Sequence, residues 1–168
     1  MKRHIILLIA FVLMSAQLFA QTPVYLTKAY KPVESDRYTA YSSLEIQGGD
    51  TWNNCFTLGV INNYHGYATF RLGGKYESIS FILGAEKSNG GNDPNIVQIH
   101  ADGKRIFDHV LRDGDLGQQF TLNISGVDKL EFSLVKPEVE AAFCEVALWT
   151  KGQTPHDIRR KHDPEVKS

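Results

Sequence analysis

The sequence has almost no excess of charge of either sign. Its 168 residues include 18 lysines and arginines and 19 aspartates and glutamates, which gives a net charge of −1 and a pI near 6.6. The dense basic cluster at residues 159–161 is offset by Asp157, Asp163 and Glu165. Nucleic-acid-binding domains present a strongly basic face to phosphates. The charge balance therefore excludes nucleic acid as a partner, and a hydrophobic content of 42% excludes a wholly disordered chain.

Long apolar runs are also lacking, apart from one near the N-terminus. Lys2 and Arg3 precede an apolar run from Ile5 to Leu13, and Ala20 comes before Gln21. A basic start, a short apolar core and a small residue at the cut are typical of a secretory signal peptide, and the run is too short to cross a bilayer comfortably. We expect residues 1–20 to be removed and the mature chain, which has no second apolar run, to be periplasmic or secreted.

Cysteine is scarce, because the sequence contains only Cys55 and Cys144. Disulfides persist in the oxidising compartments that an exported chain reaches, so an even pair favours one bridge. The alternative is two separately buried thiols, since a free cysteine packs like a small apolar residue. Neither cysteine has a basic neighbour in sequence that would stabilise a thiolate, which disfavours a catalytic role.

Motifs for catalysis and for cofactors are missing. No glycine-rich phosphate loop follows an apolar strand, and no serine lies in a G-x-S-x-G turn. Asp102 and Asp108 flank a tight hairpin, where carboxylates commonly fix turns. His65, His100 and His109 have none of the spacings typical of metal ligands. We therefore expect no enzyme activity, no cofactor and no metal, and a small hydrolase with an unrecognised site is the weakest alternative.

Alternating apolar residues dominate the chain from Tyr41 onward. Such a period of two predicts strands with one buried face. The expected strands are residues 56–59, 68–72, 79–83, 96–100, 105–111, 120–124 and 130–134. Turn residues lie between them, at 73–74, 88–94, 102–103, 113–115 and 125–126. About eight short strands predict an all-β fold, an antiparallel β-sandwich or jelly roll, over residues 21–150.

Two segments near the C-terminus are less regular. The apolar residues from Pro137 to Leu148 fit a helix opened by the proline as well as they fit a strand, so both alternatives stay open. The tail, residues 151–168, is charged and almost free of large apolar side chains. A segment that cannot bury apolar surface stays mobile, so we expect a disordered tail.

Three stretches together resemble the NPCBM domains, which are carbohydrate-binding modules appended to bacterial glycoside hydrolases and also found alone. The stretches are YLTKAYKPVESDRYTAYSSLEIQGGDTWNNCFTLGV, GYATFRLGGKYESISFILGAEKSN and NIVQIHADGKRIFDHVLRDGDLGQQFTLNISGVDKLEFSLV. The most specific parts are residues 73–76, which lead into a strand ending in Gly84, and the hairpin at 102–104, followed by 125–127. The resemblance covers the chain from Tyr25 to Trp149.

The resemblance implies a non-catalytic, galactose-binding-like β-sandwich that holds a sugar at one end. It also implies a last strand from Phe143 to Trp149. It places Cys55 and Cys144 in strands near the beginning and the end of the sandwich, which favours the disulfide. Two features depart from the family pattern: Cys55 stands in TWNNCF where a glycine is common, and no hydrolase accompanies the domain.

A sugar site requires an aromatic face for the pyranose ring and amides or carboxylates for its hydroxyls. Loops at one end of the sandwich offer this composition. The candidate ligand-binding residues are Trp52, Asn53, Tyr64, His65, Asn89, Asn92, Asp93 and Asn95. The alternative for Trp52 is a half-buried ring that covers the sandwich end, and the alternative for the loop at 88–95 is a solvated turn, with a calcium site as a minority interpretation.

These residues favour one function and leave another open. The first hypothesis is an exported, non-catalytic module that binds a glycan, with a galactose-like sugar as the candidate ligand and a glycoside hydrolase or an envelope protein as the candidate protein partner. The alternative is a protein-interaction or structural module of the cell envelope, which presents a strand edge or a loop to a partner protein.

Overall fold

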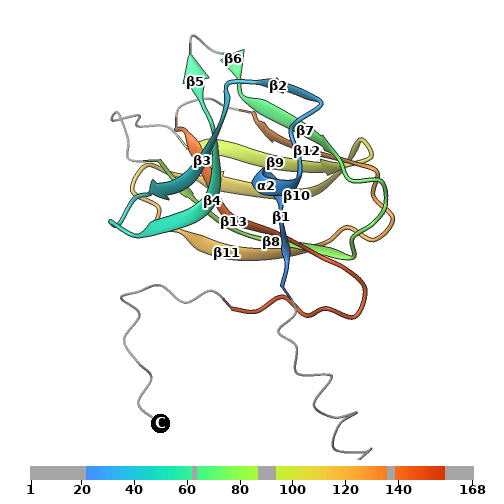
Figure 1. Ribbon diagram of the computed structural model, residues 1–168. Coiled ribbons are helices and arrows are strands. Elements are labelled where there is room, and N and C mark those ends of the chain that lie inside the picture. The colour runs from blue at the N-terminus through green and yellow to red at the C-terminus, as the bar shows by residue number, and fades with distance from the viewer. Residues whose placement is uncertain (1–21, 62–63, 87–93, 136–138, 158–168) are drawn as a thin grey trace, which may run out of the picture.

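The computed structural model describes residues 22–61, 64–86, 94–135 and 139–157. Nearly every element in this part of the chain is a strand (Figure 1). In chain order the elements are β1 (Val24–Tyr25), α2 (Leu26–Ala29), β2 (Glu34–Asp36), β3 (Tyr38–Glu45), β4 (Thr51–Leu58), β5 (Val60–Ile61), β6 (Tyr64–His65), β7 (Tyr67–Arg71), β8 (Ser78–Ala85), β9 (Asn95–Ala101), β10 (Lys104–Leu111), β11 (Gln118–Asn123), β12 (Lys129–Leu134) and β13 (Ala141–Trp149).

The strands form two antiparallel sheets that face each other (Figure 1). One sheet has six strands, in the order β11-β8-β13-β4-β3 with β1 beside β13. The other has five strands, in the order β10-β9-β12-β7-β2, and β5 and β6 pair separately. Neighbours in both sheets are mostly distant in sequence. The predicted antiparallel β-sandwich is therefore confirmed.

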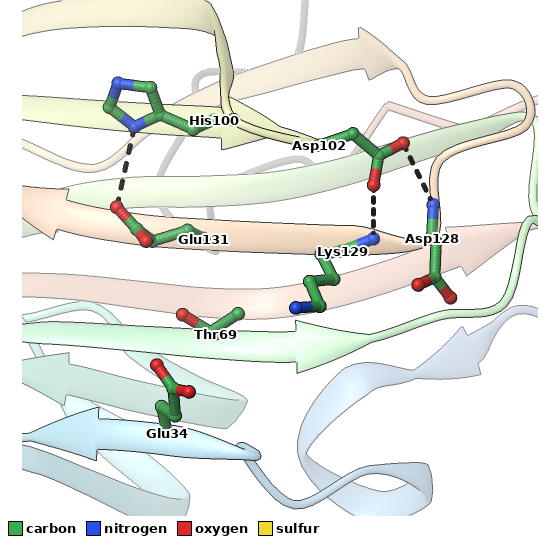
Figure 2. A pocket seen from close by; sticks show the side chains of 8 residues that line it. Glu34, Thr69, His100, Asp102, Asp128, Lys129 and Glu131 are labelled. Atoms are coloured by element: carbon green, nitrogen blue, oxygen red, sulfur yellow. Dashed lines mark hydrogen bonds and ion pairs between the residues drawn. The ribbon is translucent and has the colours of Figure 1, made fainter.

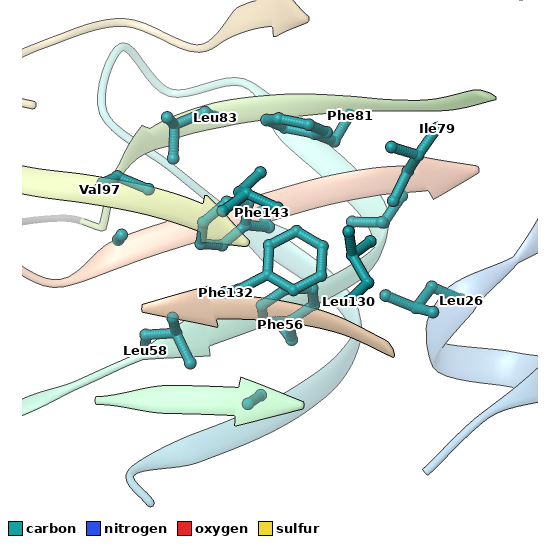
Figure 3. Close-up of a cluster of buried hydrophobic side chains, with 14 of the residues drawn as sticks. Leu26, Phe56, Leu58, Ile79, Phe81, Leu83, Val97, Leu130, Phe132 and Phe143 are labelled. Atoms are coloured by element: carbon teal, nitrogen blue, oxygen red, sulfur yellow. The ribbon is translucent and has the colours of Figure 1, made fainter. Parts of the chain in front are cut away.

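A group of phenylalanines from both sheets fills the space between them (Figure 3). Phe56 and Phe143, on neighbouring strands of the six-stranded sheet, stack with ring centroids 4.8 Å apart. Phe132 of the five-stranded sheet meets them edge-on, at 5.2 Å from Phe56 and 5.1 Å from Phe143. All three side chains are fully buried. Edge-to-face aromatic pairs add to the free energy gained from burial, so this contact holds the two layers together.

The strands agree with the sequence pattern, with additions at the start of the chain. The predicted strands from Phe56 to Leu134 each correspond to part of one of the strands β4 and β7 to β12. The ambiguous segment after Pro137 forms β13, as the family resemblance implied; residues 136–138 and the turn at 87–93 lie outside the described residues. The elements β1, α2, β2, β3, β5 and β6 were not among the expected strands, because they are too short or too polar for a clear period.

Cys55 and Cys144 form the predicted disulfide, with Cα atoms 4.0 Å apart. The bridge lies where β4 and β13 part. The two strands pair from Phe56 to Leu58 and from Ala141 to Phe143, whereas β1 takes the place beside the end of β13. Asn54, directly before Cys55, and Glu145, directly after Cys144, have positive φ angles of 52° and 48°. The disulfide therefore holds the strands together at the point where their hydrogen bonds end.

The first residues of the charged tail pack on the sandwich. His156 lies edge-on to Trp149 at 5.3 Å, and its carbonyl accepts a hydrogen bond from Gln119 Nε2 at 3.0 Å. Trp149 is buried and donates to Ser80 Oγ on the outer side of the six-stranded sheet. His156 therefore joins the beginning of the charged tail to the outer side of the six-stranded sheet. Residues 158–168 lie outside the described part of the chain.

Two glutamates meet where β8 ends and β13 begins. The amide of Glu86 donates to the carbonyl of Glu140 at 3.1 Å. Burial raises the pKa of the Glu86 carboxyl to about 7, and a hydrogen bond and the negative charge of Glu140 add to the shift. Like charges at close range disfavour double ionisation. The folded protein therefore binds a proton here at pH values where the unfolded chain has lost it.

The raised pKa of Glu86 predicts that the stability of the fold depends on pH, and that Glu86→Gln removes part of this dependence. A carboxyl whose pKa is raised by folding contributes most below its unfolded pKa of 4.5, and the contribution is lost as the pH rises through about 7. We expect Glu86→Gln to match the wild type at pH 4.5 and to melt at a higher temperature than the wild type at pH 8. Thermal melts at both pH values measure this, with the exposed Glu45→Gln as the control. Equal melting of Glu86→Gln and wild type at pH 8 would contradict it.

Candidate functional site

The side chain of Trp52 is buried on β4, with only 6% of its surface exposed. It packs in a second apolar cluster on the six-stranded sheet, which comprises Ile46, Cys55, Ile82, Ala142 and Cys144, with Tyr41 and Leu44 at its margin. Its indole nitrogen has no hydrogen-bond partner among the described residues. The ring is therefore almost fully buried in this cluster on the outer side of the six-stranded sheet, where it leaves little surface on which a sugar could stack.

The other predicted site residues lie on different elements. Asn53 is exposed on β4, and its amide donates to Glu145 Oε1 at 2.9 Å. Asn95 is fully buried at the start of β9 and donates from Nδ2 to the carbonyl of Val139 at 2.6 Å. His65 is exposed on β6 next to Tyr64. The residues Asn89, Asn92 and Asp93 lie outside the described part of the chain. Asn95 thus serves the fold, and Asn53 and His65 are open to solvent.

A carboxylate lies beside Asn53 at this end of the sandwich. Glu145 also accepts a weaker hydrogen bond, at 3.4 Å, from Nδ2 of the buried Asn54. Burial, followed by the charge of Glu145 and a hydrogen bond to it, raises the pKa of the Tyr25 hydroxyl. Glu145 therefore already serves the backbone and two side chains, which leaves it little capacity for a ligand.

The outer face of the five-stranded sheet carries a hollow of about 670 Å³, which we call the polar hollow (Figure 2). Its lining comprises Glu34, Thr69, His100, Asp102, Gly103, Asp128, Lys129 and Glu131. Strand register explains the arrangement, because Glu131 on β12 lies opposite both His100 on β9 and Thr69 on β7. Thr69 in turn lies opposite Glu34 on β2. Residues opposite one another share a face, so four strands contribute one row of polar side chains.

A tight turn positions the carboxylate at one end of this hollow. Asp102 and Gly103 both have positive φ, 49° and 82°, as the two-residue turn between β9 and β10 requires. The Asp102 carboxylate accepts hydrogen bonds from the amides of Lys129, at 2.8 Å, and Asp128, at 3.2 Å (Figure 2). These bonds tie the turn to the start of β12. The wall of the hollow is therefore held by backbone contacts.

The histidine in the row lies beside a carboxylate. His100 Nδ1 lies 3.7 Å from Glu131 Oε1, which is too far for a hydrogen bond. That nitrogen is buried and has no hydrogen-bond partner among the described residues. The row thus places an imidazole and a carboxylate side by side, both half-buried, next to the buried Thr69. Such groups are suited to the donors and acceptors of a hydroxyl-rich ligand.

A second hollow of about 420 Å³ adjoins the first, and we call it the Tyr67 hollow. Its lining comprises His65, Tyr67, Glu131, Ser133, Leu134 and Val135. Glu131 belongs to both hollows. The second is the less polar of the two, because Tyr67 is half-buried and Val135 is 39% exposed. Together they form a groove over the sheet, polar at one end and apolar at the other.

The alternation of polar and apolar residues around His100 and Glu131 is a sequence signal for this groove. His100 and Glu131 alternate with the buried residues Ile99, Leu130 and Phe132, so their outward position follows from the period of two. The sequence does not show that these two residues are neighbours, because this depends on which strands pair.

Among the described residues, no group of three or more histidine, cysteine or acidic side chains is placed to hold a metal ion. In the same ranges no helix is long and apolar enough to cross a membrane.

The architecture defines a galactose-binding-like β-sandwich of the kind found in carbohydrate-binding modules. Residues 15–153 match the model of the NPCBM/NEW2 domain, and the chain therefore belongs to this family, as its sequence pattern suggested. No curated protein matches the chain.

Solved structures show the same fold at low sequence identity. The CBM51 module of Clostridium perfringens GH95, in complex with methyl-galactose, superposes with a TM-score of 0.60 at 13% identity, over 76% of this chain and 99% of that one. A structure of the M60 catalytic domain with two CBM51 domains from Clostridium perfringens ZmpB gives 0.62 at 17% identity, over 78% of this chain and 15% of that one. The K1 adhesin domain of Lys-gingipain from Porphyromonas gingivalis gives 0.51 at 12% identity, over 75% and 96%.

The buried position of Trp52 predicts a loss of stability when its ring is removed. Truncation of a packed tryptophan to alanine costs about 3 to 5 kcal/mol, because the cavity collapses only in part. We expect Trp52→Ala to lower the free energy of unfolding by this amount, measured by urea denaturation. The control is Asn53→Ala at the exposed neighbouring position, which should change stability by less than about 1 kcal/mol. A Trp52→Ala variant as stable as the wild type would contradict the buried assignment.

Proposed function

We propose that this protein is an exported, non-catalytic module that binds a carbohydrate. Membership of the NPCBM/NEW2 family is the observation that carries the proposal. The groove over the five-stranded sheet adds to it, because it collects hydroxyl, imidazole, amine and carboxylate groups beside a tyrosine. Sugars are recognised by such polar groups together with an aromatic ring. The methyl-galactose bound to a module of the same fold supports a galactose-like ligand as the first to test.

The carboxylates of the groove are better suited to binding than to catalysis. Glycoside hydrolysis requires one carboxyl as acid and a second as base or nucleophile across the scissile bond. Here both oxygens of Asp102 accept backbone hydrogen bonds, and Asp128 lies 4.0 Å from the Arg71 guanidinium. Both carboxylates are thus engaged in contacts within the fold, and this supports a module that serves a glycoside hydrolase or an envelope protein rather than an enzyme in its own right.

Docking to a protein is the second candidate function. Strands β3 and β10 each pair with one strand only, so they are edges of the sheets in the described part of the chain. An edge strand offers unpaired backbone groups to an extended segment of a partner. The two functions differ in their ligand, and a glycan screen separates them.

Two surfaces are candidates for the sugar. One is the sandwich end with the exposed Asn53 and the predicted loop at 89–95, and the other is the groove with His65 at its rim. The first lacks the stacking face that Trp52 was expected to supply.

Export predicts a processed N-terminus. Expression of the full-length chain in a bacterial host should yield a product outside the cytoplasm that begins at Gln21, since a signal peptidase cuts after a small residue such as Ala20. Intact-mass measurement of the cell fractions checks this. Leu8→Arg breaks the apolar core and serves as the matched control, which should stay inside with residues 1–20 attached. Retention of the wild-type chain at full length in the cytoplasm would contradict export.

Carbohydrate binding predicts a positive glycan screen. The purified protein should bind one class of glycan on an array, and isothermal titration with the best hit should give saturable binding. Incubation with that glycan should release no shorter product, as a module without an acid and base pair leaves glycosidic bonds intact. A blank array would favour the protein-docking function, and turnover of the glycan would contradict the non-catalytic assignment.

A further inference from the structure

We propose that the groove over the five-stranded sheet holds an extended, uncharged or amino-bearing oligosaccharide, with Glu131 and Tyr67 as its central contacts. The inference rests on the proposed carbohydrate-binding function and names the location and the ligand class. Its basis is the pair of hollows that meet at Glu131.

The groove is longer than a single sugar ring. Its lining follows β12 from Lys129, in the polar hollow, to Val135, which lines the Tyr67 hollow just past the end of the strand. At about 3.3 Å per residue, this stretch of strand spans roughly 20 Å. A ligand that fills both hollows is therefore a chain of sugars that lies along the sheet.

Two rows of side chains cross the groove, and they differ in character. The first contains the polar side chains of His100, Glu131 and Glu34, together with the buried Thr69. Two residues further along the strands, the second row places Ser133 between Gln98 and Tyr67. The half-buried ring of Tyr67 provides the apolar surface that the first row lacks. A sugar hydroxyl can thus bind in the first row while the apolar side of a neighbouring ring packs on Tyr67.

The charge of the polar hollow selects against acidic sugars. Four carboxylates, those of Glu34, Asp102, Asp128 and Glu131, line it together with one lysine, Lys129, and one histidine. A uronate or sialate carboxylate placed there would meet an excess of negative charge in a partly desolvated groove, where the repulsion is stronger than in water. Neutral hydroxyls and protonated amines instead find acceptors. The ligand class is therefore a neutral or amino-bearing oligosaccharide.

Calorimetric titration of the purified protein with the best neutral glycan from the array tests the location. We expect Glu131→Gln to weaken binding about tenfold, because a hydrogen bond to a charged acceptor is replaced by one to an amide. Tyr67→Ala should weaken it about tenfold through loss of the ring, whereas Tyr67→Phe should keep most of the affinity. The matched control is Asp108→Asn, an exposed carboxylate on β10 outside both hollows, which should stay within about twofold. Melting temperatures close to the wild type ensure that each variant is folded.

Two further titrations test the ligand class. A tetrasaccharide should bind at least about tenfold more tightly than its monosaccharide, since it reaches both hollows. The analogue in which one hydroxymethyl group is oxidised to a carboxylate should bind at least about tenfold more weakly. Equal affinity for the neutral and the oxidised ligand would overturn the charge selection.

The outcomes separate this inference from the proposed function. If the wild type binds a glycan and Glu131→Gln and Tyr67→Ala bind it equally well, the groove is not the site and the function survives. A loss of affinity in Asn53→Ala alone would then place the sugar at the sandwich end. If the wild type binds no glycan at all, the proposed function itself fails.

Discussion

The contact of Phe132 with Phe56 and Phe143 sets the register on which the rest of the structure depends. Because side chains alternate between the two faces of a strand, the choice of the buried residue fixes every outward residue as well. With Phe132 inside, Glu131 and Ser133 are outside, and strand pairing brings His100 and Tyr67 beside them. A slip of one residue would bury the carboxylate and expose the ring. The packing of the core therefore also builds the groove.

Much of the fold could be predicted from the sequence, because its strands keep a period of two and its turns carry glycine. The placement of Trp52 could not. Asn54 adopts a positive φ, so Trp52 and Cys55, three residues apart, pack in one cluster although simple alternation would put them on opposite faces. A polar residue in a left-handed conformation within a strand leaves little trace in the apolar pattern. The aromatic that was expected to receive a sugar consequently supports the disulfide.

The groove could not be predicted from the sequence, and the reason differs from that for Trp52. Its central row joins residues from β2, β7, β9 and β12, which are spread over about one hundred positions of the chain. Alternation predicts that Glu34, His100 and Glu131 point outward, but it cannot tell which outward residues become neighbours. The family resemblance supplied the sandwich and the last strand. The resemblance implied a sugar site in loops at one end of the sandwich, whereas the two hollows lie on the face of the five-stranded sheet.

The tail segment over Trp149 makes the two sides of the sandwich unequal. On the six-stranded sheet His156 and the cluster around the disulfide cover outward side chains, whereas none of the described elements covers the polar rows of the five-stranded sheet. The two faces of the sandwich thus differ: the outer face of the six-stranded sheet is closed by apolar and aromatic contacts, and the outer face of the five-stranded sheet presents polar side chains. A molecule that binds the five-stranded face would meet strands alone, with His156 on the opposite face.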